Sequence, residues 1–453
     1  MHLEDLRHVR QPLQGGGQVV VLDTGALITA EAAAMLQALH SRSVHGIDAH
    51  LMKLAQKGAA QFMDTYYIGY GDKSIGDCGT ATVFIEGVSM LAAKAIQDSQ
   101  LYNGQESSTR YVDFSTQPFI SPDESASELS ESLRTFHTEG LATMKEELMD
   151  RHPRGEEDEK KWKKAINARA FDIMRSFLPA GMATNLAWHT TLRHAADHLL
   201  RLRNHPLDEV RAIALTIEEA LNTMYPNSFK QKRYEATEQY VSEWMKESYY
   251  FDLNTQNTSE PISFFSGVRV ERDGIDRNLL ARYAPILSNR PIKAELPRFL
   301  AECGSIRFLF FLDFGSFRDL QRHRAVTQRM PLLTNSWEFA PWYLDQMPQE
   351  LRKKALSVLQ KQRAALNKLS IAPVYRQYYI PMGYSVPCRL TGDLPGLTWL
   401  VELRSGISVH PTLRRVAQEI GVLLLETFGL TLYIDRSEDR FDIKRGEHDI
   451  VEK

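Results

Sequence analysis

The feature that most constrains the fold is an apparent duplication of the chain. The segment DCGT at 77–80 begins a run that continues into VFIEGVS, and ECGS at 302–305, which lies 225 residues later, begins a run that continues into FLFFLDFGS. The stretches at 174–203 and 375–404 also resemble each other, because each has a proline early and a Leu-Arg pair at its end. Each stretch then continues into a helix-like apolar pattern. These paired patterns predict that one structural unit occurs twice.

A polar segment separates the two predicted copies. The stretch DLNTQNTSEP at 252–261 is rich in turn formers and closes on a proline, which is typical of a linker. We therefore expect a first repeat at 1–253, a linker at 254–261 and a second repeat at 262–453.

Both strand and helix patterns occur along the chain. The runs VVVLD at 19–23 and TATVFIEGV at 80–88 are typical of strands. Longer runs with helical periodicity occur at 28–41, 157–177, 206–224 and 411–428. The charged run GEEDEKKWKK, at the start of the second of these helices, suits a solvated helix face. We predict a mixed α/β fold of the α+β kind in each repeat.

The composition is that of an ordinary globular protein. The chain has 453 residues, of which 43% are hydrophobic and 25% are charged. Its 54 Lys and Arg residues nearly balance its 57 Asp and Glu residues, so no net field attracts nucleic acid or an anionic membrane. A small charged ligand fits this composition better, and we expect neither nucleic acid nor membrane as a partner.

Other sequence features point to the cytoplasm. The N-terminal stretch lacks the apolar core of a signal peptide, and no uncharged apolar run approaches the length of a membrane span. The three cysteines, Cys78, Cys303 and Cys388, are far apart and form no CxxC pair. This pattern argues against a disulfide framework and against a zinc site. We expect a cytoplasmic protein with reduced cysteines and no metal.

Two polar stretches could carry chemistry. The first is NGQESSTRYVDFS at 103–115. If it is extended, alternation places Glu106, Ser108 and Arg110 on one side, where they could hold a ligand with an anionic group and an amide-like edge. The alternative is an ordinary strand exit with a local Glu–Arg pair.

The second stretch is QRHRAVTQRM, which follows an apolar run. In an extended chain Arg322 and Arg324 share one side and His323 points to the other, whereas in a helix the three side chains fan apart. Both geometries favour a bridging role over a single pocket. The alternative is solvated surface charge.

Together these stretches resemble the flavin-dependent thymidylate synthases. The signature of that family joins Arg-His-Arg to a later acid/Gln-x-Ser-x-Arg-Tyr segment, and here it is split between the repeats. The first repeat keeps ESSTRY at 106–111 but has DSQ at 98–100 in place of Arg-His-Arg. The second repeat keeps Arg-His-Arg at 322–324 but has LLTN at 332–335 in place of the later segment.

The resemblance extends outward on both sides of the signature. Ser74 matches a segment usually written Tyr-Gly-His-x-Ser-x-x-Glu-His, although Asp72, Asp77 and Cys78 depart from it. Glu302 stands at the matching distance before the Arg-His-Arg of the second repeat, and the resemblance implies a flavin-side role for Glu302.

The resemblance also implies a set of arginines that contact the nucleotide. Arg175, in RSFLP, matches an arginine that binds the substrate phosphate, and the second repeat has Gln377 at that place. Arg203 and Arg404 match the arginine that contacts the pyrimidine ring, and we predict them as the catalytic residues. The Asn-x-Arg segment of the family, which contacts the flavin, is poorly kept in both repeats.

The resemblance implies methylation of the C5 atom of dUMP. In that family FAD is the cofactor, and NADPH and methylenetetrahydrofolate are co-substrates. It implies that Glu106, Ser108, Arg110, Arg175 and Arg203 bind the nucleotide. It also implies that Arg322, His323, Arg324, Glu302 and Ser74 bind the flavin.

Family sites lie where subunits of a tetramer meet, so a chain with two repeats could form a homodimer that acts as a pseudo-tetramer. Complete sites would then require the Arg-His-Arg of the second repeat to face the substrate loop of the first. Two alternatives stay open. One is a non-catalytic or re-purposed homologue that binds a nucleotide or flavin as a sensor or scaffold. The other keeps the flavin chemistry but methylates a different acceptor, such as UMP.

Overall fold

The structure is a computed structural model that describes residues 7–23, 25, 28–41, 43, 47–69, 71–110, 113–249 and 264–443. The predicted linker at 254–261 lies outside the described residues. The chain forms two compact units: unit 1 comprises Met1–Ser107 and Met182–Ser248, and unit 2 comprises Ser108–Gly181 and Tyr249–Lys453.

Unit 1 is built on a five-stranded antiparallel sheet. Its strands are β1 (His8–Pro12), β2 (Gln18–Leu22), β3 (Thr80–Ser89), β4 (Asn103–Glu106) and β5 (Ala183–Thr191), in the order β1-β2-β3-β5-β4. The predicted strands 19–23 and 80–88 correspond to β2 and β3. Alternate residues such as Val83 and Ile85 are fully buried, because one face of an antiparallel sheet packs on the core.

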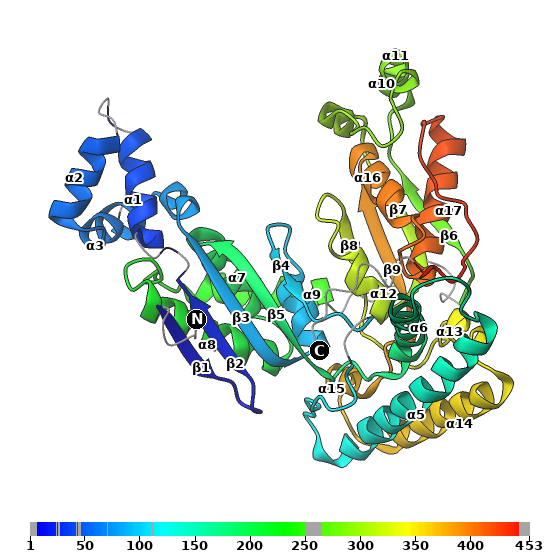
Figure 1. Ribbon diagram of the computed structural model, residues 1–453. Helices are drawn as coiled ribbons and strands as arrows, with labels where there is room; N and C mark the ends of the chain where they lie inside the picture. The colour runs from blue at the N-terminus through cyan, green and yellow to red at the C-terminus, as the bar shows by residue number, and fades with distance from the viewer. Residues whose placement is uncertain are drawn as a thin grey trace. The chain divides into compact units, whose positions relative to one another are not determined.

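Helices α7 and α8 lie on one face of this sheet (Figure 1). Helix α8 packs against β1 and β2. The helical segments of unit 1 are α1 (Ala30–Ser41), α2 (Ile47–Lys57), α3 (Ala60–Phe62), η2 (Met63–Gly69), η3 (Lys73–Cys78), α4 (Met90–Gln97), α7 (Leu192–Leu202), α8 (Asp208–Met224) and α9 (Glu235–Tyr249).

Unit 2 contains a four-stranded antiparallel sheet. Its strands are β6 (Val268–Asp273), β7 (Ile306–Asp313), β8 (Thr327–Arg329) and β9 (Ser385–Gly392), in the order β6-β7-β9-β8. This order repeats the order β2-β3-β5-β4 of unit 1. The matching strand orders support the predicted tandem arrangement and agree with the predicted mixed α/β fold.

Unit 2 has more helix than unit 1. The long helices α5 (Ser127–Arg151) and α14 (Gln349–Lys368) lie side by side (Figure 1). The other helical segments are η4 (Glu124–Ala126), α6 (Glu159–Met174), η5 (Arg175–Phe177), α10 (Arg277–Arg282), α11 (Ala284–Ser288), η7 (Arg298–Cys303), α12 (Phe314–Leu320), α13 (Pro341–Asp345), α15 (Pro373–Arg376), η8 (Gln377–Tyr379), α16 (Leu394–Arg404) and α17 (Pro411–Phe428).

The compact units are not the two sequence halves. Residues 108–181 come from the first predicted repeat but lie in unit 2, where the two RSFLP-like segments pair with each other. Pro179 forms an antiparallel bridge with Pro381, and the backbone N–H of Gly181 donates to the carbonyl of Tyr378 over 2.8 Å. A long piece of the first repeat therefore packs with the second. The repeat boundary itself stays a prediction about the sequence.

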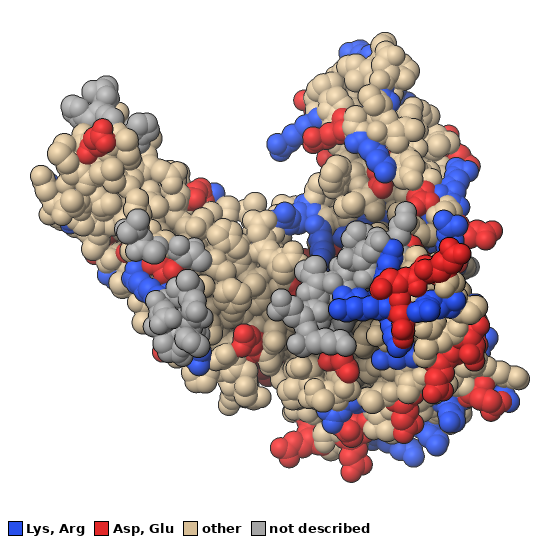
Figure 2. All heavy atoms as spheres, viewed as in Figure 1, with Lys and Arg blue, Asp and Glu red and all other residues tan. Residues whose placement is uncertain are grey.

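Charged residues of both signs alternate on the part of unit 2 that carries α5 and α14 (Figure 2). At the start of α6, Lys163 and Glu159 form an exposed ion pair of 2.6 Å, as expected for the solvated run GEEDEKKWKK.

The three cysteines are free thiols. Among the described residues, no helix is long and apolar enough to cross a membrane, and no group of three or more metal-ligating side chains is gathered at one point.

Candidate functional site

The predicted substrate loop begins in unit 1 and continues into unit 2 just after β4 ends. Glu106 is the last residue of β4 in unit 1, and its carboxylate accepts a hydrogen bond of 2.6 Å from the side chain of Gln97. The chain then leaves the strand, and residues 109 and 110 form a turn in which the Ser108 hydroxyl accepts from the backbone N–H of Arg110 over 3.3 Å. The extended geometry assumed for Ser108 and Arg110 is therefore absent, because the strand ends before them.

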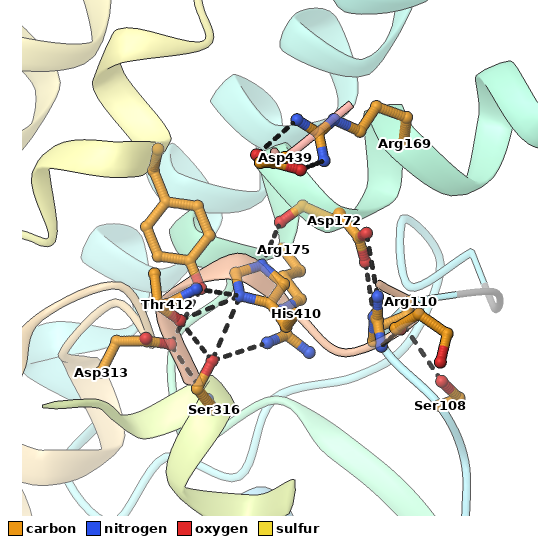
Figure 3. Close-up of polar contacts among 12 residues, drawn as sticks. Ser108, Arg110, Arg169, Asp172, Arg175, Asp313, Ser316, His410, Thr412 and Asp439 are labelled. Carbon is orange, nitrogen blue, oxygen red and sulfur yellow. Dashed lines mark hydrogen bonds and ion pairs between the residues drawn. The ribbon is translucent and has the colours of Figure 1, made fainter. Parts of the chain in front are cut away.

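Arg110 is anchored inside unit 2 by a bidentate ion pair. Its Nε lies 2.6 Å and its Nη2 lies 3.1 Å from the two carboxylate oxygens of Asp172, which is fully buried on α6. Its Nη1 donates to the carbonyl of Ser408 over 3.2 Å. Arg110 thus connects the first-repeat loop to the segment between α16 and α17 of the second repeat (Figure 3).

Arg175 is a buried cation with unused hydrogen-bonding capacity. It is 2% exposed, its Nη2 donates to the hydroxyl of Ser316 over 3.2 Å, and its Nε has no partner among the described residues. Burial acts to lower the pKa of Arg175, but Tyr343 and the carboxylates of Asp319 and Asp313 outweigh it, so the pKa is raised. Arg175 therefore stays charged and could donate further hydrogen bonds.

Behind Arg175 lies a buried hydroxyl and imidazole network (Figure 3). His410 lies 3.3 Å through Nδ1 from the Ser316 hydroxyl and 2.9 Å through the same atom from the Thr412 hydroxyl. Its Nε2 lies 3.3 Å from the carbonyl of Asp172. Burial, reinforced by the charge of Arg175, holds the pKa of His410 well below its usual range. His410 is thus a neutral residue that donates from Nε2 and accepts at Nδ1.

The Arg-His-Arg triplet follows α12 in a turn. Arg322 and Arg324 are exposed, whereas His323 is 7% exposed. The triplet is therefore neither in the extended strand nor in the helix considered from the sequence. The Nε2 of His323 accepts a hydrogen bond of 2.6 Å from the Nε of Arg404. Burial and the neighbouring Arg404 lower the pKa of His323 to about 3, so the ring is neutral and carries its proton on Nδ1.

Arg404 and the triplet share one cavity of about 360 Å³. Arg404 is fixed by His323 and by a hydrogen bond of 2.9 Å from its Nη2 to the carbonyl of Asp319. Trp399 and Leu403, also on α16, add apolar surface to the cavity. The structure therefore brings together three of the five residues predicted to bind flavin and one of the two predicted catalytic arginines.

The carboxylate of Asp319 interacts electrostatically with arginines from both sequence halves. Burial raises its pKa, but four arginines outweigh burial, and the pKa is lowered. Two of the arginines come from the first repeat and two from the second: Arg175, Arg110, Arg322 and Arg404. Asp172 pairs with Arg110 and Asp313 lies near Arg175, so three carboxylates face four guanidinium groups, and the positive charge that remains suits a ligand with phosphate groups.

The first-repeat counterpart of Arg404 has different surroundings. Arg203 lies in unit 1 beside a cavity of about 460 Å³, and its Nε donates to both oxygens of Glu238 at 3.1 Å. A second carboxylate, that of Glu218, lies 3.7 Å from Arg203. Arg203 is therefore already paired with the carboxylates of Glu238 and Glu218.

The remaining predicted residues are peripheral to these contacts. In unit 1 the exposed hydroxyl of Ser74 donates to Asp72 over 2.6 Å. In unit 2 Glu302 is exposed on η7, which packs against α16. Gln377, which replaces the Arg175 counterpart, accepts from the backbone N–H of Leu333 over 3.0 Å.

Sequence reasoning missed four residues of this region: Asp172, Ser316, Asp319 and His410. Only Asp319 left a sequence signal, because it precedes Arg322 by three residues at the end of a helix, where such pairs meet. The other three act through burial and long-range contacts, which a single sequence does not display.

Comparison with known proteins supports the predicted resemblance. Residues 21–227 match the family model described as thymidylate synthase complementing protein. A UPF0159 protein of Chlamydia muridarum is 26% identical over 450 residues, covering 83% of this chain and 84% of the relative. A UPF0159 protein of Thermoplasma acidophilum is 24% identical over 428 residues, covering 80% and 85% respectively. The matched 83% and 80% of this chain exceed the length of either predicted repeat, so both alignments extend into the two halves.

Proposed function

We propose that this chain, whose residues 21–227 match the family model described as thymidylate synthase complementing protein, methylates the C5 atom of a pyrimidine nucleotide in a flavin-dependent reaction. The first candidate acceptor is dUMP, and UMP is the second. The observation that carries the proposal is that two arginines of the first half contact the second half: Arg110 donates to the carbonyl of Ser408 and Arg175 to the hydroxyl of Ser316, each over 3.2 Å. The charges of both arginines also act on Asp319, together with those of Arg322 and Arg404. FAD would be the cofactor, with NADPH and methylenetetrahydrofolate as co-substrates. We propose that the reaction takes place in the cytoplasm.

The nucleotide phosphate would bind at Arg175. Its buried Nε lacks a partner among the described residues, and an unpaired buried donor is costly unless a ligand accepts its hydrogen. Arg110 would act mainly as a positioning residue, because Asp172 and Ser408 already occupy its guanidinium. Ser108 holds the turn that presents Arg110.

The flavin would be held by Arg322 and Arg324. Their exposed guanidinium groups line the cavity that Arg404 shares and can take phosphate oxygens in a fork. When bound, FAD supplies the redox chemistry that methyl transfer requires. His323 and the carbonyl of Asp319 keep Arg404 in one orientation by accepting from its Nε and Nη2, and an N–H group that they do not occupy would contact the pyrimidine edge.

Glu106, Ser74 and Arg203 lie in unit 1, and Glu302 lies on η7. Their predicted substrate and flavin roles stay part of the proposal. The occupation of Arg203 by Glu238 and Glu218 favours one working site per chain, built from the second-repeat Arg404.

A second candidate function is nucleotide or flavin binding without catalysis, as a sensor or scaffold. The departures Asp72 and Asp77 from the family segment, together with the occupied Arg203, favour it for the first repeat. Such a protein would bind a uridine nucleotide without methylating it.

Flavin retention tests the proposal. The purified protein is incubated with FAD, the excess is removed, and the visible absorption spectrum is recorded. We expect a retained flavin band in the wild type and a loss of at least tenfold in affinity for Arg322→Ala, because a charge-assisted contact contributes roughly 1.5 to 3 kcal/mol. The matched control is Arg352→Ala, since Arg352 is equally exposed and pairs only with surface Asp345 in the described contacts.

Two results would count against the flavin proposal. A wild type that retains no flavin but binds dUMP would favour the sensor or scaffold function. Equal flavin retention by Arg322→Ala and Arg352→Ala would mean that Arg322 does not bind flavin and that the triplet is ordinary surface charge. A holoprotein that turns over UMP but not dUMP would keep the chemistry and change the acceptor.

We also propose that two chains form a homodimer. Trp399 and Leu403 are 56% and 51% exposed and lie four residues apart on α16, beside the Arg-His-Arg cavity. Large apolar side chains gathered at one surface commonly mark an interface. Light scattering should give the mass of a dimer for the wild type and of a monomer for Trp399→Glu. A wild-type monomer at micromolar concentration would refute the pseudo-tetramer.

A further inference from the structure

Unit 2 contains a second cavity of about 360 Å³ with a lining different from that of the arginine cavity. Its walls include the aromatic rings of Phe264, Phe265, Phe311 and Trp342. The ring of Phe311 packs against those of Phe264 and Phe265, with centroids 4.8 Å and 5.2 Å apart. These rings offer flat apolar surface to a planar ligand.

A buried carboxylate also lines this cavity. Asp313 ends β7 and is 0% exposed. Its Oδ1 accepts from the backbone N–H of Ser316 over 3.0 Å and from the hydroxyl of Tyr343 over 2.8 Å. Its Oδ2 is buried and has no hydrogen-bond partner among the described residues. An unsatisfied buried carboxylate oxygen is costly, so this atom calls for a donor.

The corresponding position in unit 1 shows that the fold itself does not require the spare oxygen. Ser89 ends β3 as Asp313 ends β7, and Ser89 caps α4 by accepting from the N–H of Ala92 over 3.0 Å. The backbone N–H and the hydroxyl of Ser89 both donate to Glu209, at 2.8 Å and 2.6 Å. A serine thus meets the capping requirement there with its polar atoms occupied. The second oxygen of Asp313 is an addition of the second repeat.

The charges around this cavity select the class of ligand. Three carboxylates line it, but Glu419 pairs with Arg415 at 2.9 Å and Asp345 pairs with Arg352 at 3.2 Å, so Asp313 is the lining carboxylate without an ion pair in the described contacts. Arg175 lies near Asp313 but donates its hydrogen bond to Ser316 instead. An anionic nucleotide is disfavoured in such a lining, whereas a cation or an N–H donor is favoured.

We propose that this cavity binds a planar aromatic compound that carries a cationic nitrogen substituent, and that the nitrogen donates a hydrogen bond to Oδ2 of Asp313 while the ring packs against Phe311 and Trp342. The proposal concerns a site separate from the proposed nucleotide and flavin site. It does not depend on methyl transfer.

Benzamidine and benzoate test the proposal, because they share size and planarity but have opposite charges. Binding to the full-length protein is measured by isothermal titration calorimetry and by ligand-observed NMR. We expect benzamidine to bind at least tenfold more tightly than benzoate. Equal affinities, or no benzamidine binding at millimolar concentration, would overturn the proposal.

Matched variants locate the bound ligand. Asp313→Asn and Asp345→Asn each remove one carboxylate from the lining, but only Asp313 has the buried unpaired oxygen. We expect Asp313→Asn to weaken benzamidine binding roughly 10- to 100-fold and Asp345→Asn to weaken it less than threefold. Equal effects of the two variants would mean general charge attraction and would contradict the assignment.

A third variant keeps the test decisive if Asp313→Asn does not fold. Ser266 is exposed at the edge of the same cavity, and Ser266→Trp should fill the space without touching the core. We expect it to abolish benzamidine binding with an unchanged circular dichroism spectrum. Retained binding would place the ligand elsewhere.

Discussion

At the scale of single residues, an arginine can bind a ligand only through N–H groups that other residues of the protein do not already occupy. Arg110 and Arg175 both come from the first repeat. Arg110 is partly buried and forms a bidentate pair with Asp172, whereas Arg175 is fully buried and its Nε is unpaired among the described residues. The first residue therefore positions the loop, and the second remains available to a ligand. His323 positions Arg404, because its Nε2 accepts a hydrogen bond from the Nε of Arg404.

His323 should make the protein sensitive to acid. Its pKa in the folded state is lowered to about 3 by burial and by Arg404, whereas an unfolded histidine has a pKa of about 6.5. Between these values the unfolded chain binds a proton that the folded chain excludes, so stability falls as the pH is lowered through this window. From pH 7 to pH 5 this single group accounts for a loss of up to about 2 kcal/mol.

Urea unfolding at pH 7 and pH 5 measures this effect. His323→Gln keeps an acceptor for Arg404 but does not titrate, so its stability should depend less steeply on pH than that of the wild type. Other buried histidines, such as His198 and His410, also have lowered pKa values and contribute the slope that remains. An identical pH dependence in wild type and variant would mean that His323 is already protonated, or is exposed, at pH 5.

At the scale of helices and strands, local patterns carried most of the prediction. Helix α17 has the bounds 411–428 that its apolar periodicity indicates, and α6 and α8 fall within their predicted segments. The polar run at 103–115 was considered as one extended segment, but β4 ends at Glu106. Polar residues that alternate without an apolar partner face specify no register.

The end of α17 gives a prediction at this scale. Gly429 adopts φ = 62° as the C-cap of α17, and nothing surrounds the position where a Cβ would stand. Gly429→Ala should therefore lower the free energy of unfolding by about 1 kcal/mol through backbone strain alone.

Gly406 provides the matched control. It precedes α17 without a left-handed φ, and a Cβ there would meet only ordinary contacts. Gly406→Ala should be neutral or slightly stabilising in the same denaturation experiment. If both alanine variants had the same stability, the left-handed cap would not be a determinant of α17.

At the scale of the whole molecule, residues 108–181 of the first predicted repeat lie in unit 2, and this places their arginines in the same unit as the Arg-His-Arg triplet. The sequence supplied the arginines and the triplet, and it predicted that halves of a split signature must meet. It could not indicate where they meet, because the pairing of Pro179 with Pro381 and the burial of Asp172 are contacts between residues far apart in the chain. Asp319 left a sequence signal only through its spacing to Arg322, and its interaction with Arg110 and Arg175 became apparent only in the folded chain.

The central claim is that one nucleotide site uses residues from both halves. Its most direct test is the affinity for dUMP of the wild type, Arg175→Ala, Arg404→Ala and the double variant, measured by calorimetry. A composite site predicts that each single variant binds roughly 10- to 100-fold more weakly and that the double variant shows non-additive coupling. Unchanged affinity in Arg404→Ala, with a loss confined to Arg175→Ala, would contradict a site shared between the halves.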